Sequence, residues 1–447
     1  MGQKYRPRRP GLWLALYALF RFTEAQNTNA CGVGSNYTVG SNYTITSQND
    51  ADLFISCNRP PDGKLFEPTG DLIISPSTPQ DIKLISSDTV INGTVVAENN
   101  PFLRSLTYAL EPGQFDFGPG GYGITLRNLS HLQSLSINAS VMLWGPVIFD
   151  NLPALESLSM LGYTPFNFNL TISHLPLLKT IVTSDSNPYV TAVKNITIND
   201  VPTLESLDAF FQVGLPSTNI TAAGIPAVTN LTYALLHADH VSIQASGNLS
   251  LLFRGWCSFQ PSYICKFPRY SEEGFTIRTA DLSLSGLSNL QTHHEAYVRL
   301  GTLRASANTF SNISLDFADL QGLYLLDNPR LERVWLRRRS GNFSWQELVI
   351  RNNPLLRFGG SRADRAADLA EPTAFIGDDE LNTTFYWPAR DIDSVELEGP
   401  FDNEFFQPFI DRRTDGSANQ SRVLKRFVVD STLPPDRFNC TGLDRLR

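Results

Sequence analysis

The stretch ITLRNLSHLQSLSI, residues 124–137, decides the fold, because four further copies of it follow along the chain. Each copy has alternating apolar residues, one polar or glycine residue, a turn, and a second short alternating run. The starts of the five copies advance by 23, 23, 26 and 24 residues, at Ile124, Val147, Leu170, Ile196 and Ile220. A period in this range predicts a solenoid, in which each unit stacks on the next.

The form of the unit favours strands over helices. Alternating apolar residues are typical of a half-buried strand, and a proline in the turn interrupts any helix. The turn prolines are Pro153, Pro176, Pro202 and Pro226. Leucine-rich repeats share this period, but the asparagine that follows their strand is Ser140 in the first copy. We therefore expect an all-β fold, a right-handed parallel β-helix that is similar to receptor L-domains and leucine-rich-repeat solenoids.

The repeat returns after an interruption and sets the expected organisation. Later copies begin at Leu282, Leu323 and Leu348, and the last two carry Asn328 and Asn353 in place of the turn leucine. We expect a signal peptide in 1–25, an N-terminal cap and first coils in 26–99, and solenoid repeats in 100–360 with a loop insertion at 254–281. Residues 361–447 are expected to form an irregular segment and closing coils.

The N-terminus is typical of a secretory signal peptide. Four basic residues between Lys4 and Arg9 precede an apolar run at 12–20, and Thr23 and Ala25 suit a cut before Gln26. Its removal takes away five basic groups and one acidic group, so the formal charge moves from -8 to -8 - 5 + 1 = -12. An acidic mature chain disfavours nucleic acid as a partner, because phosphate contacts need a basic face.

Fifteen Asn-x-Ser/Thr triplets follow this signal peptide and predict a surface glycoprotein. Several of them lie at the edges of repeat strands, which would place glycans in rows along one face. The acceptor residues are Asn36, Asn42, Asn92, Asn128, Asn138, Asn169, Asn195, Asn219, Asn230, Asn248, Asn312, Asn342, Asn382, Asn419 and Asn439.

Five cysteines fit an oxidising compartment. Cys31 and Cys57 flank a segment with a turn at Asp50 and Asp52, and we expect them to form a disulfide in the N-terminal cap, where an open solenoid end needs cover. Cys257 and Cys265 are expected to close the small loop 258–264. Cys440 is left unpaired, so it pairs between chains or its partner lies beyond Arg447.

These features together resemble the fungal receptor L-domain-like cell-surface proteins, a family of GPI-anchored proteins of cell-wall organisation and sporulation. The resemblance rests on the cysteine-flanked start, the Leu-Pro-x-Leu turns, and the closing runs LEGPF (397–401), FVVDST (427–432) and FNC (438–440). It implies a place at the cell surface. No GPI signal or spanning helix is read in this sequence, so we expect membrane attachment only through an anchor that the sequence does not contain.

Parallel β-helices also include polysaccharide lyases and hydrolases, and glycoside cleavage needs two carboxylates that act as an acid and a base. The candidate pairs are Asp316 with Asp319 and Asp378 with Asp379. Neither pair comes with clustered Arg, Lys or His residues that would bind a uronic-acid substrate. We expect both pairs to lie in solvated turns, since a fold alone does not imply an activity.

Other clusters carry weaker signals. His237 with His240, and His293 and His294 with Glu295, lack the third and fourth ligands that a zinc site needs, so no metal or cofactor is expected. The arginines at 337–339 after Trp335 could bind an anionic glycan or lipid headgroup, but a solvated turn is the expectation. Aromatic residues at strand positions are expected to pack in the core or in stacked ladders; they include Phe166, Phe168, Tyr324 and Trp345.

The sequence thus predicts a secreted, non-catalytic cell-surface glycoprotein that supports fungal cell-wall organisation. Its place would be extracellular, in the wall or on the outer face of the plasma membrane, with wall glycan or wall proteins as partners. An alternative is a receptor-like or lectin-like ectodomain that binds wall glycan or peptide, since solenoids offer long surfaces. A polysaccharide-cleaving enzyme is the third and least favoured hypothesis.

Overall fold

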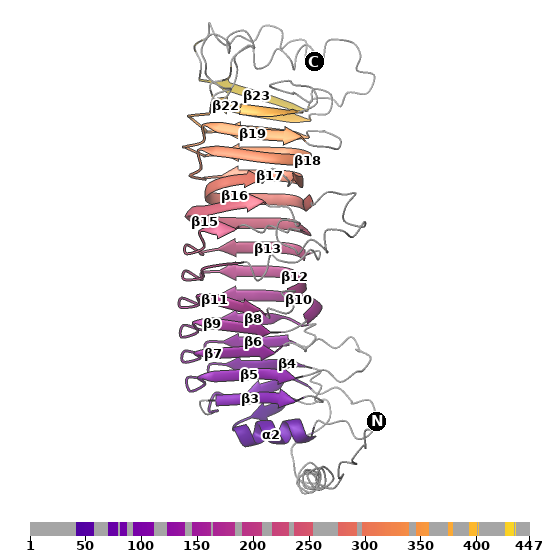
Figure 1. Ribbon diagram of the computed structural model, residues 1–447, viewed down its shortest axis with the longest axis vertical. Coiled ribbons are helices and arrows are strands. Elements are labelled where there is room, and N and C mark those ends of the chain that lie inside the picture. The colour runs from indigo at the N-terminus through magenta and orange to yellow at the C-terminus, as the bar shows by residue number, and fades with distance from the viewer. Residues whose placement is uncertain are drawn as a thin grey trace, which may run out of the picture.

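The computed structural model shows a long stack of parallel strands with a helix at its N-terminal end (Figure 1). It describes residues 42–57, 70–78, 81–86, 93–110, 123–138, 145–161, 164–183, 190–207, 217–231, 237–253, 276–292, 297–338, 346–356, 374–378, 393–399, 401, 425–432 and 434. Every strand pairing in these ranges is parallel. The expectation of a parallel, nearly all-β fold is therefore confirmed.

The strands form two sheets. The small sheet has five strands: β3 (Asp81–Ser86), β5 (Ser105–Leu110), β7 (Ser134–Asn138), β9 (Ser157–Leu161) and β11 (Thr180–Thr183). The large sheet has eighteen strands: β1 (Tyr43–Ile45), β2 (Leu72–Ile74), β4 (Thr94–Glu98), β6 (Gly123–Arg127), β8 (Val147–Asp150), β10 (Thr164–Ser173), β12 (Val190–Asn199), β13 (Ser217–Ala223), β14 (Asn230–Leu231), β15 (His237–Phe253), β16 (Thr276–Thr292), β17 (Tyr297–Ser306), β18 (Asn312–Leu326), β19 (Arg333–Arg338), β20 (Glu347–Arg351), β21 (Ala374–Asp378), β22 (Ser394–Gly399) and β23 (Arg426–Ser431).

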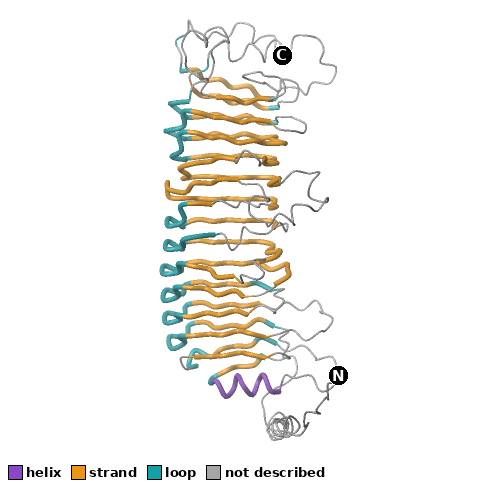
Figure 2. Tube along the Cα trace, viewed as in Figure 1, coloured by secondary structure: helices purple, strands orange, loops and turns teal. Residues whose placement is uncertain are grey.

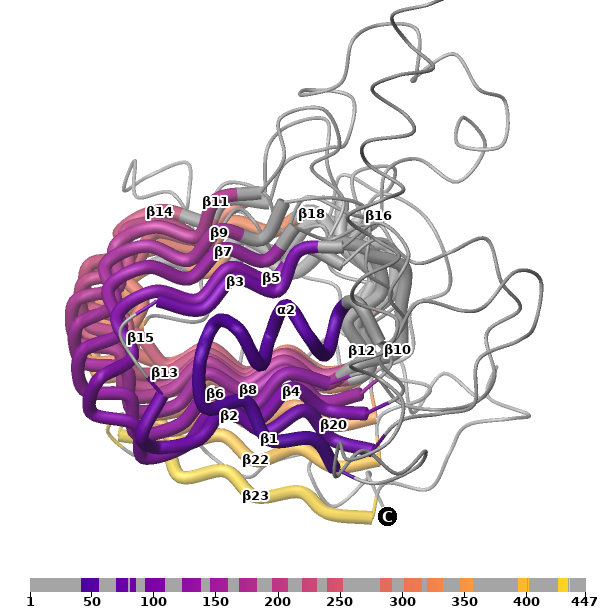
Figure 3. The backbone as a smooth tube through the Cα atoms, turned by 90° about the horizontal axis from the view of Figure 1, so that it is seen from below, coloured from indigo at the N-terminus to yellow at the C-terminus, as the bar shows by residue number. Residues whose placement is uncertain are grey.

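The five sequence copies stack in register, as the repeat predicts. Ile124 pairs with Val147, Val147 with Leu170, Leu170 with Ile196, and Ile196 with Ile220. The inward-facing apolar residues of these strands are buried in one core that extends from Ile45 to Phe401. Figure 3, a view along the stack, shows the two layers of strands facing each other. Burial of these alternating apolar residues is what holds one coil on the next.

A sharp corner follows the large-sheet strand of ten coils in the described part of the chain. Its residue has a left-handed backbone with φ between 51° and 68°, and is asparagine, aspartate, histidine, alanine or glycine: Asn99, Asn128, Asn151, His174, Asp200, Gly224, Gly286, Ala307, Asp327 and Asn352. Apart from Ala307, these are residue types that adopt this conformation at little cost or, for histidine, more readily than most. The polar or glycine position of the repeat is thus a backbone requirement.

A tight turn comes next and explains the Leu-Pro-x-Leu pattern. The amide of Leu155 donates to the carbonyl of Leu152 at 3.2 Å, and Leu178 does the same to Leu175 at 3.3 Å. Proline at the second position suits this turn, because its ring fixes φ near the required value. The loops of these turns lie along one side of the stack in Figure 2.

Beyond the core repeats the strands lengthen. β15, β16 and β18 have 17, 17 and 15 residues, and they continue through the corner from one part of the coil into the next. β15 and β16 pair over most of their length, although 254–275 lies between them in the sequence. The strand stack therefore continues across the predicted insertion. The closing strands expected near Val395 and 423–429 are β22 and β23, which pair with each other.

One helix, α2 (Gln48–Cys57), covers the N-terminal end, where the sequence predicted a turn at Asp50 and Asp52. That prediction was wrong. The helix begins because the Ser47 hydroxyl accepts a hydrogen bond from the Asp50 amide at 3.2 Å, and the Asp50 carboxylate accepts one from the Thr46 amide at 2.9 Å. Together these bonds satisfy amides that a helix start leaves unpaired.

The helix covers the N-terminal end of the core and the exposed edge of β3. Ala51 and Phe54 are buried against the first coil, and α2 lies across the opening between the sheets in Figure 3. The side-chain amide of Gln48 pairs with β3, the last strand of the small sheet on this side. It accepts from the Lys83 amide at 2.9 Å and donates to the Lys83 carbonyl at 3.0 Å. An exposed strand edge is thus capped by one side chain.

We expect Gln48→Ala to loosen this end of the stack. Two hydrogen bonds to the β3 backbone disappear, and a loss of about 1–2 kcal/mol in unfolding free energy follows from typical hydrogen-bond values. The variant should unfold at a lower urea concentration, and the Lys83 amide should exchange its proton faster. Asn49→Ala, an exposed neighbour in the same helical turn, is the control and should change neither quantity by a comparable amount.

Candidate functional site: an uncharged polar face of the large sheet

Three of the four carboxylates that the sequence offered as acid and base pairs lie in strands. Asp316 and Asp319 are inside β18, and Asp378 is the last residue of β21, so the expected turns at these positions are wrong. The side chains of these three residues, and all of Asp379, lie outside the part of the chain that the structure describes.

The structure likewise describes only part of the histidine and arginine clusters. His237 and His240 belong to β15, and the side chain of His240 is exposed, whereas His293, His294 and Glu295 lie outside the described ranges. Arg337 and Arg338 follow Trp335 in β19 rather than in a turn, which corrects that expectation for the backbone. Among the described residues no group of three or more His, Cys, Asp or Glu side chains could hold a metal ion.

Several other predicted features cannot be placed. The signal peptide at 1–25, four of the five cysteines (Cys31, Cys257, Cys265 and Cys440) and Trp345 fall outside the described ranges. Cys57 ends α2, and Phe166 and Phe168 lie in β10, but the positions of their side chains are not part of the description. Within the ranges that are described, no helix has the length and apolar character needed to cross a bilayer.

The glycosylation triplets with described side chains all face solvent at least partly. Asn195 and Asn219 are half-buried, and the others are exposed: Asn42, Asn128, Asn169, Asn230, Asn248 and Asn312. Asn138 is the last residue of β7, and only its backbone is described. The remaining acceptors, Asn36, Asn92, Asn342, Asn382, Asn419 and Asn439, lie outside the described ranges. A buried acceptor would have spoken against a glycoprotein, and none occurs among the described side chains.

Three of these acceptors form a row on the outer face of the large sheet. Asn169, Asn195 and Asn219 lie on neighbouring strands in register. The Asn195 side-chain amide donates to the Asn169 side-chain carbonyl at 2.6 Å, and Asn219 donates to Asn195 at 2.7 Å. Since parallel strands are about 4.8 Å apart, glycans here would form a dense row on β10, β12 and β13.

A column of hydroxyl groups runs beside this row on the same face. Its members are in register on five successive strands, β10, β12, β13, β15 and β16: Thr171, Thr197, Thr221, Ser242 and Ser283. Because strand side chains alternate, this column lies between the buried apolar residues and points outward. None of these five hydroxyls has a hydrogen-bond partner within the described parts of the chain. Each is therefore available to a ligand or to water.

The next two strands continue the column with a stacked pair. Ser283 pairs with Arg304 on β17, and Arg304 pairs with Tyr324 on β18. The Arg304 guanidinium carbon lies 3.7 Å from the centre of the Tyr324 ring, a close cation–π contact. Tyr324 thus occupies a strand position with ladder packing, as the sequence predicted. No carboxylate pairs with Arg304 among the described residues, so its N–H groups remain available.

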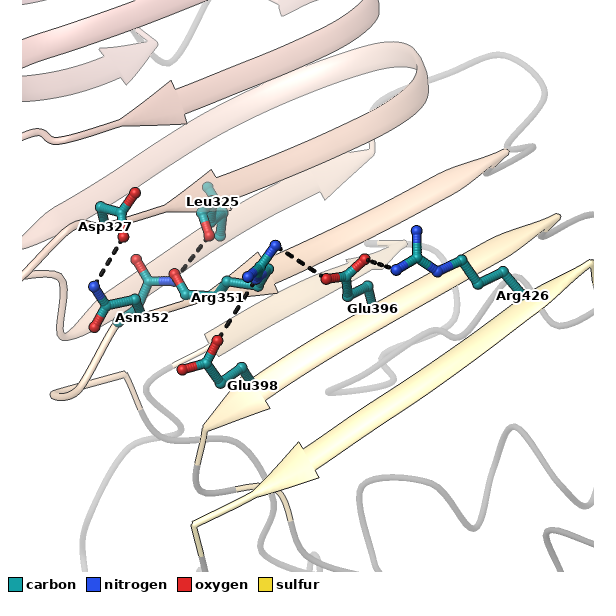
Figure 4. Close-up of polar contacts among 8 residues, drawn as sticks. Leu325, Asp327, Arg351, Asn352, Glu396, Glu398 and Arg426 are labelled. Atoms are coloured by element: carbon teal, nitrogen blue, oxygen red, sulfur yellow. Dashed lines mark hydrogen bonds and ion pairs between the residues drawn. The ribbon is translucent and has the colours of Figure 1, made fainter.

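A cluster of charged residues lies on the face towards its C-terminal end (Figure 4). Arg351 on β20 lies 3.1 Å from Glu396 and 3.6 Å from Glu398, both on β22. Arg426 on β23 lies 2.8 Å from Glu396. These arginines have carboxylate partners, which contrasts with Arg304. Such partly exposed pairs align neighbouring strands and contribute little net stability each.

The corner at the N-terminal end of the face carries a second polar cluster. Asp150 accepts hydrogen bonds from the Ser173 hydroxyl at 2.7 Å and from His174 Nδ1 at 2.8 Å. Burial by itself would raise the pKa of the Asp150 carboxyl. The hydrogen bonds from His174 and Ser173, with the charges of His174 and Arg127, outweigh this and hold the pKa below its usual value.

This shift predicts an acid-dependent loss of stability. A carboxyl whose pKa is lower in the folded state stabilises the fold above its unfolded pKa of about 3.9, and the contribution is lost as pH falls through the folded value. We expect Asp150→Asn to reduce stability at neutral pH and to have less effect at the acid end of that window. Urea unfolding of both proteins across acid pH measures it. An equal loss at every pH would contradict the assignment.

Comparison of the chain with protein-family models, with curated proteins and with solved structures gives no significant match. The function is therefore argued from the site itself. Sequence reasoning identified the glycosylation triplets and placed Tyr324 in a strand. It missed the hydroxyl column, because the column becomes visible only when residues 21 to 41 positions apart are brought into register, as with Thr221, Ser242 and Ser283.

Proposed function

We propose that this protein is a secreted, non-catalytic cell-surface glycoprotein that supports fungal cell-wall organisation. The observation that carries the proposal is the exposure of the acceptor asparagines whose side chains are described, above all the row of Asn169, Asn195 and Asn219. A long, regular stack that displays glycans on one face suits a structural part of a wall, where a rigid spacer with a hydrated surface is needed.

The finer fold assignment belongs to the same proposal. We infer a right-handed parallel β-helix of the receptor L-domain kind, with a Cys31–Cys57 disulfide in the N-terminal cap. The coil-by-coil register and the repeated left-handed corner support a regular helix of strands. The position of Cys57 at the end of the capping helix supports the Cys31–Cys57 disulfide. The resemblance to the fungal receptor L-domain-like family supports both the fold and the cell-wall function, and it implies attachment through a GPI anchor.

Two experiments test the cellular role. A strain deleted for the gene should be more sensitive to wall-perturbing dyes and to cell-wall lytic enzymes, and the wild-type gene should restore resistance. Wild-type resistance in the deletion strain would contradict the proposal. In fractionated cells the protein should be found outside the plasma membrane or in the wall, and a cytosolic, unglycosylated protein would contradict it as well.

A lectin-like function is the second candidate, and one observation favours it. The hydroxyl column and Arg304, which has no carboxylate partner among the described residues, leave hydrogen-bonding groups available in the middle of the face. Binding of wall polysaccharide by the purified protein would support this candidate. An enzyme that cleaves polysaccharide is the third; the release of reducing ends or unsaturated products from wall polymers would establish it and exclude a non-catalytic role.

A further inference from the structure

We propose that the face formed by β15, β16, β17 and β18 binds an extended neutral polysaccharide, with Ser242, Ser283 and Arg304 as its hydrogen-bonding groups. The inference rests on the lectin-like candidate above and assigns it a site and a ligand class. Its chemistry follows from three features of the described residues: a free hydroxyl column, a guanidinium held without a carboxylate partner, and the distribution of charge along the face.

The hydroxyl column supplies donors and acceptors at a regular spacing. Neighbouring members are about 4.8 Å apart, the distance between parallel strands. A hydroxyl both donates and accepts a hydrogen bond, as sugar hydroxyls do. Ser242 and Ser283 are the accessible part of the column, because the three threonines lie beside the acceptor asparagines of β10, β12 and β13. Glycans at those asparagines would cover them.

Arg304 is held in place before a ligand arrives. Its guanidinium lies against the Tyr324 ring at 3.7 Å, and its side chain is exposed to solvent. Gly322 leaves room beside that ring: a Cβ there would lie 3.4 Å from Tyr324 Cε2 and 3.2 Å from Thr302. Stacking on the ring reduces the freedom that Arg304 would lose on binding, and a guanidinium offers five N–H donors in one plane. Tyr324 is therefore a positioning residue.

The charge distribution favours a neutral ligand. The chain has a formal net charge of -8 before any processing, and carboxylates lie on both sides of the proposed site. Glu98 and Asp150 are on one side, and Glu347, Glu396 and Glu398 are on the other. Arg127, Arg351 and Arg426 offset part of this negative charge, and Glu347 has no cationic partner among the described residues. A polyanion that followed the stack would be repelled by the remaining carboxylates, whereas a neutral polymer of sugar units would not be repelled. Arg304 then donates to sugar oxygens.

The test uses the full chain and three soluble polymers: a neutral β-glucan, a chitin oligomer and polygalacturonate. We expect retention by a neutral polymer and none by polygalacturonate. Tyr324→Ala and Ser242→Ala/Ser283→Ala should each weaken binding about tenfold, consistent with the loss of one or two well-placed contacts. Neither serine belongs to a glycosylation triplet, so these changes leave the protein's own glycans unaltered.

Matched variants outside the face serve as controls. Ser136→Ala/Ser159→Ala removes two registered hydroxyls on β7 and β9 of the small sheet, and Phe102→Ala removes an aromatic side chain that is 57% exposed. These variants should bind like the wild type. Because Tyr324 acts through Arg304, Tyr324→Phe, which keeps the ring, should retain most of the wild-type affinity. Arg304→Lys should not retain it. Circular dichroism and thermal unfolding confirm that each variant is folded.

Other outcomes would overturn the inference. Binding by the wild type with no loss in Tyr324→Ala or the serine pair would place the ligand elsewhere and leave the lectin-like function standing. Retention by polygalacturonate alone would contradict the neutral ligand. Retention that disappears after enzymatic removal of the protein's N-glycans, with the protein still folded, would show that the glycans make the contact. No retention by any polymer overturns the inference, whereas the wall-organisation proposal is tested separately by the deletion strain.

Discussion

Replacing Asn328 by leucine is expected to lower the unfolding free energy by about 4 kcal/mol, because it leaves buried polar groups without partners. Asn328 is fully buried, and its side-chain carbonyl accepts from the backbone amide and the side-chain amide of Asn308, both at 3.0 Å. Its own amide donates to the Ala305 carbonyl and to Asn353, again at 3.0 Å. Urea unfolding measures the loss.

A triple variant distinguishes the loss of hydrogen-bond partners from a change in side-chain packing. Leucine or another aliphatic residue fills the same offset in the middle coils, as at Leu129, Leu152 and Leu175, where it is also buried. Replacing Asn308, Asn328 and Asn353 together by leucine removes both sides of the mutual side-chain hydrogen bonds. We therefore expect the triple variant to lose less than the sum of the three single losses. Strict additivity would contradict a cooperative asparagine ladder.

Replacing Gly286 by alanine is expected to cost more than about 3 kcal/mol and to disrupt the corner within β16, where β16 passes β15. A Cβ at this position would lie 2.0 Å from the Ala245 carbonyl oxygen, so the backbone would have to move. The residue also has a φ of +68°, a left-handed conformation that costs an L-residue about 1–2 kcal/mol. Thermal unfolding of the purified variant should show a clear loss.

Gly247→Ala is the matched control for this effect. Gly247 also has a positive φ, at +98°, but a Cβ there would lie no closer than 3.7 Å to Thr309. The control therefore carries the conformational strain without the collision, and we expect it to lose only about 1–2 kcal/mol. Equal losses in the two variants would mean that the close approach of neighbouring coils does not explain the glycine.

The repeated part of the fold could be predicted because the same physical constraint acts on every coil. Strand alternation places Leu126 and Phe149 in the core, and the corner residue of most coils adopts a left-handed backbone. Both constraints therefore select a residue type at a fixed position of the repeat, and this selection is visible in the sequence. Asparagine in place of the turn leucine at Asn328 and Asn353 was visible in the same way. The hydrogen bonds that these side chains make could be recognised only once the strand register was known.

The parts that were missed lack such a periodic signal. The coil of β17 carries Ala307 at the left-handed corner, where other coils have a polar residue or glycine. It begins only 21 residues after Leu282 and 20 before Leu323. Helix α2 occurs once, and Ser47 and Asp50 start it locally. The Arg304–Tyr324 pair joins side chains on two coils of irregular length, so no spacing in the sequence indicates it.

The most direct test of the central claim is peptide mass spectrometry of the secreted protein after enzymatic removal of N-glycans in ¹⁸O-labelled water. The account predicts a mature N-terminus at Gln26 and ¹⁸O-labelled aspartate at exposed acceptors, including members of the row Asn169, Asn195 and Asn219. A protein that keeps residues 1–25 and carries unmodified asparagine at every triplet would contradict a secreted surface glycoprotein.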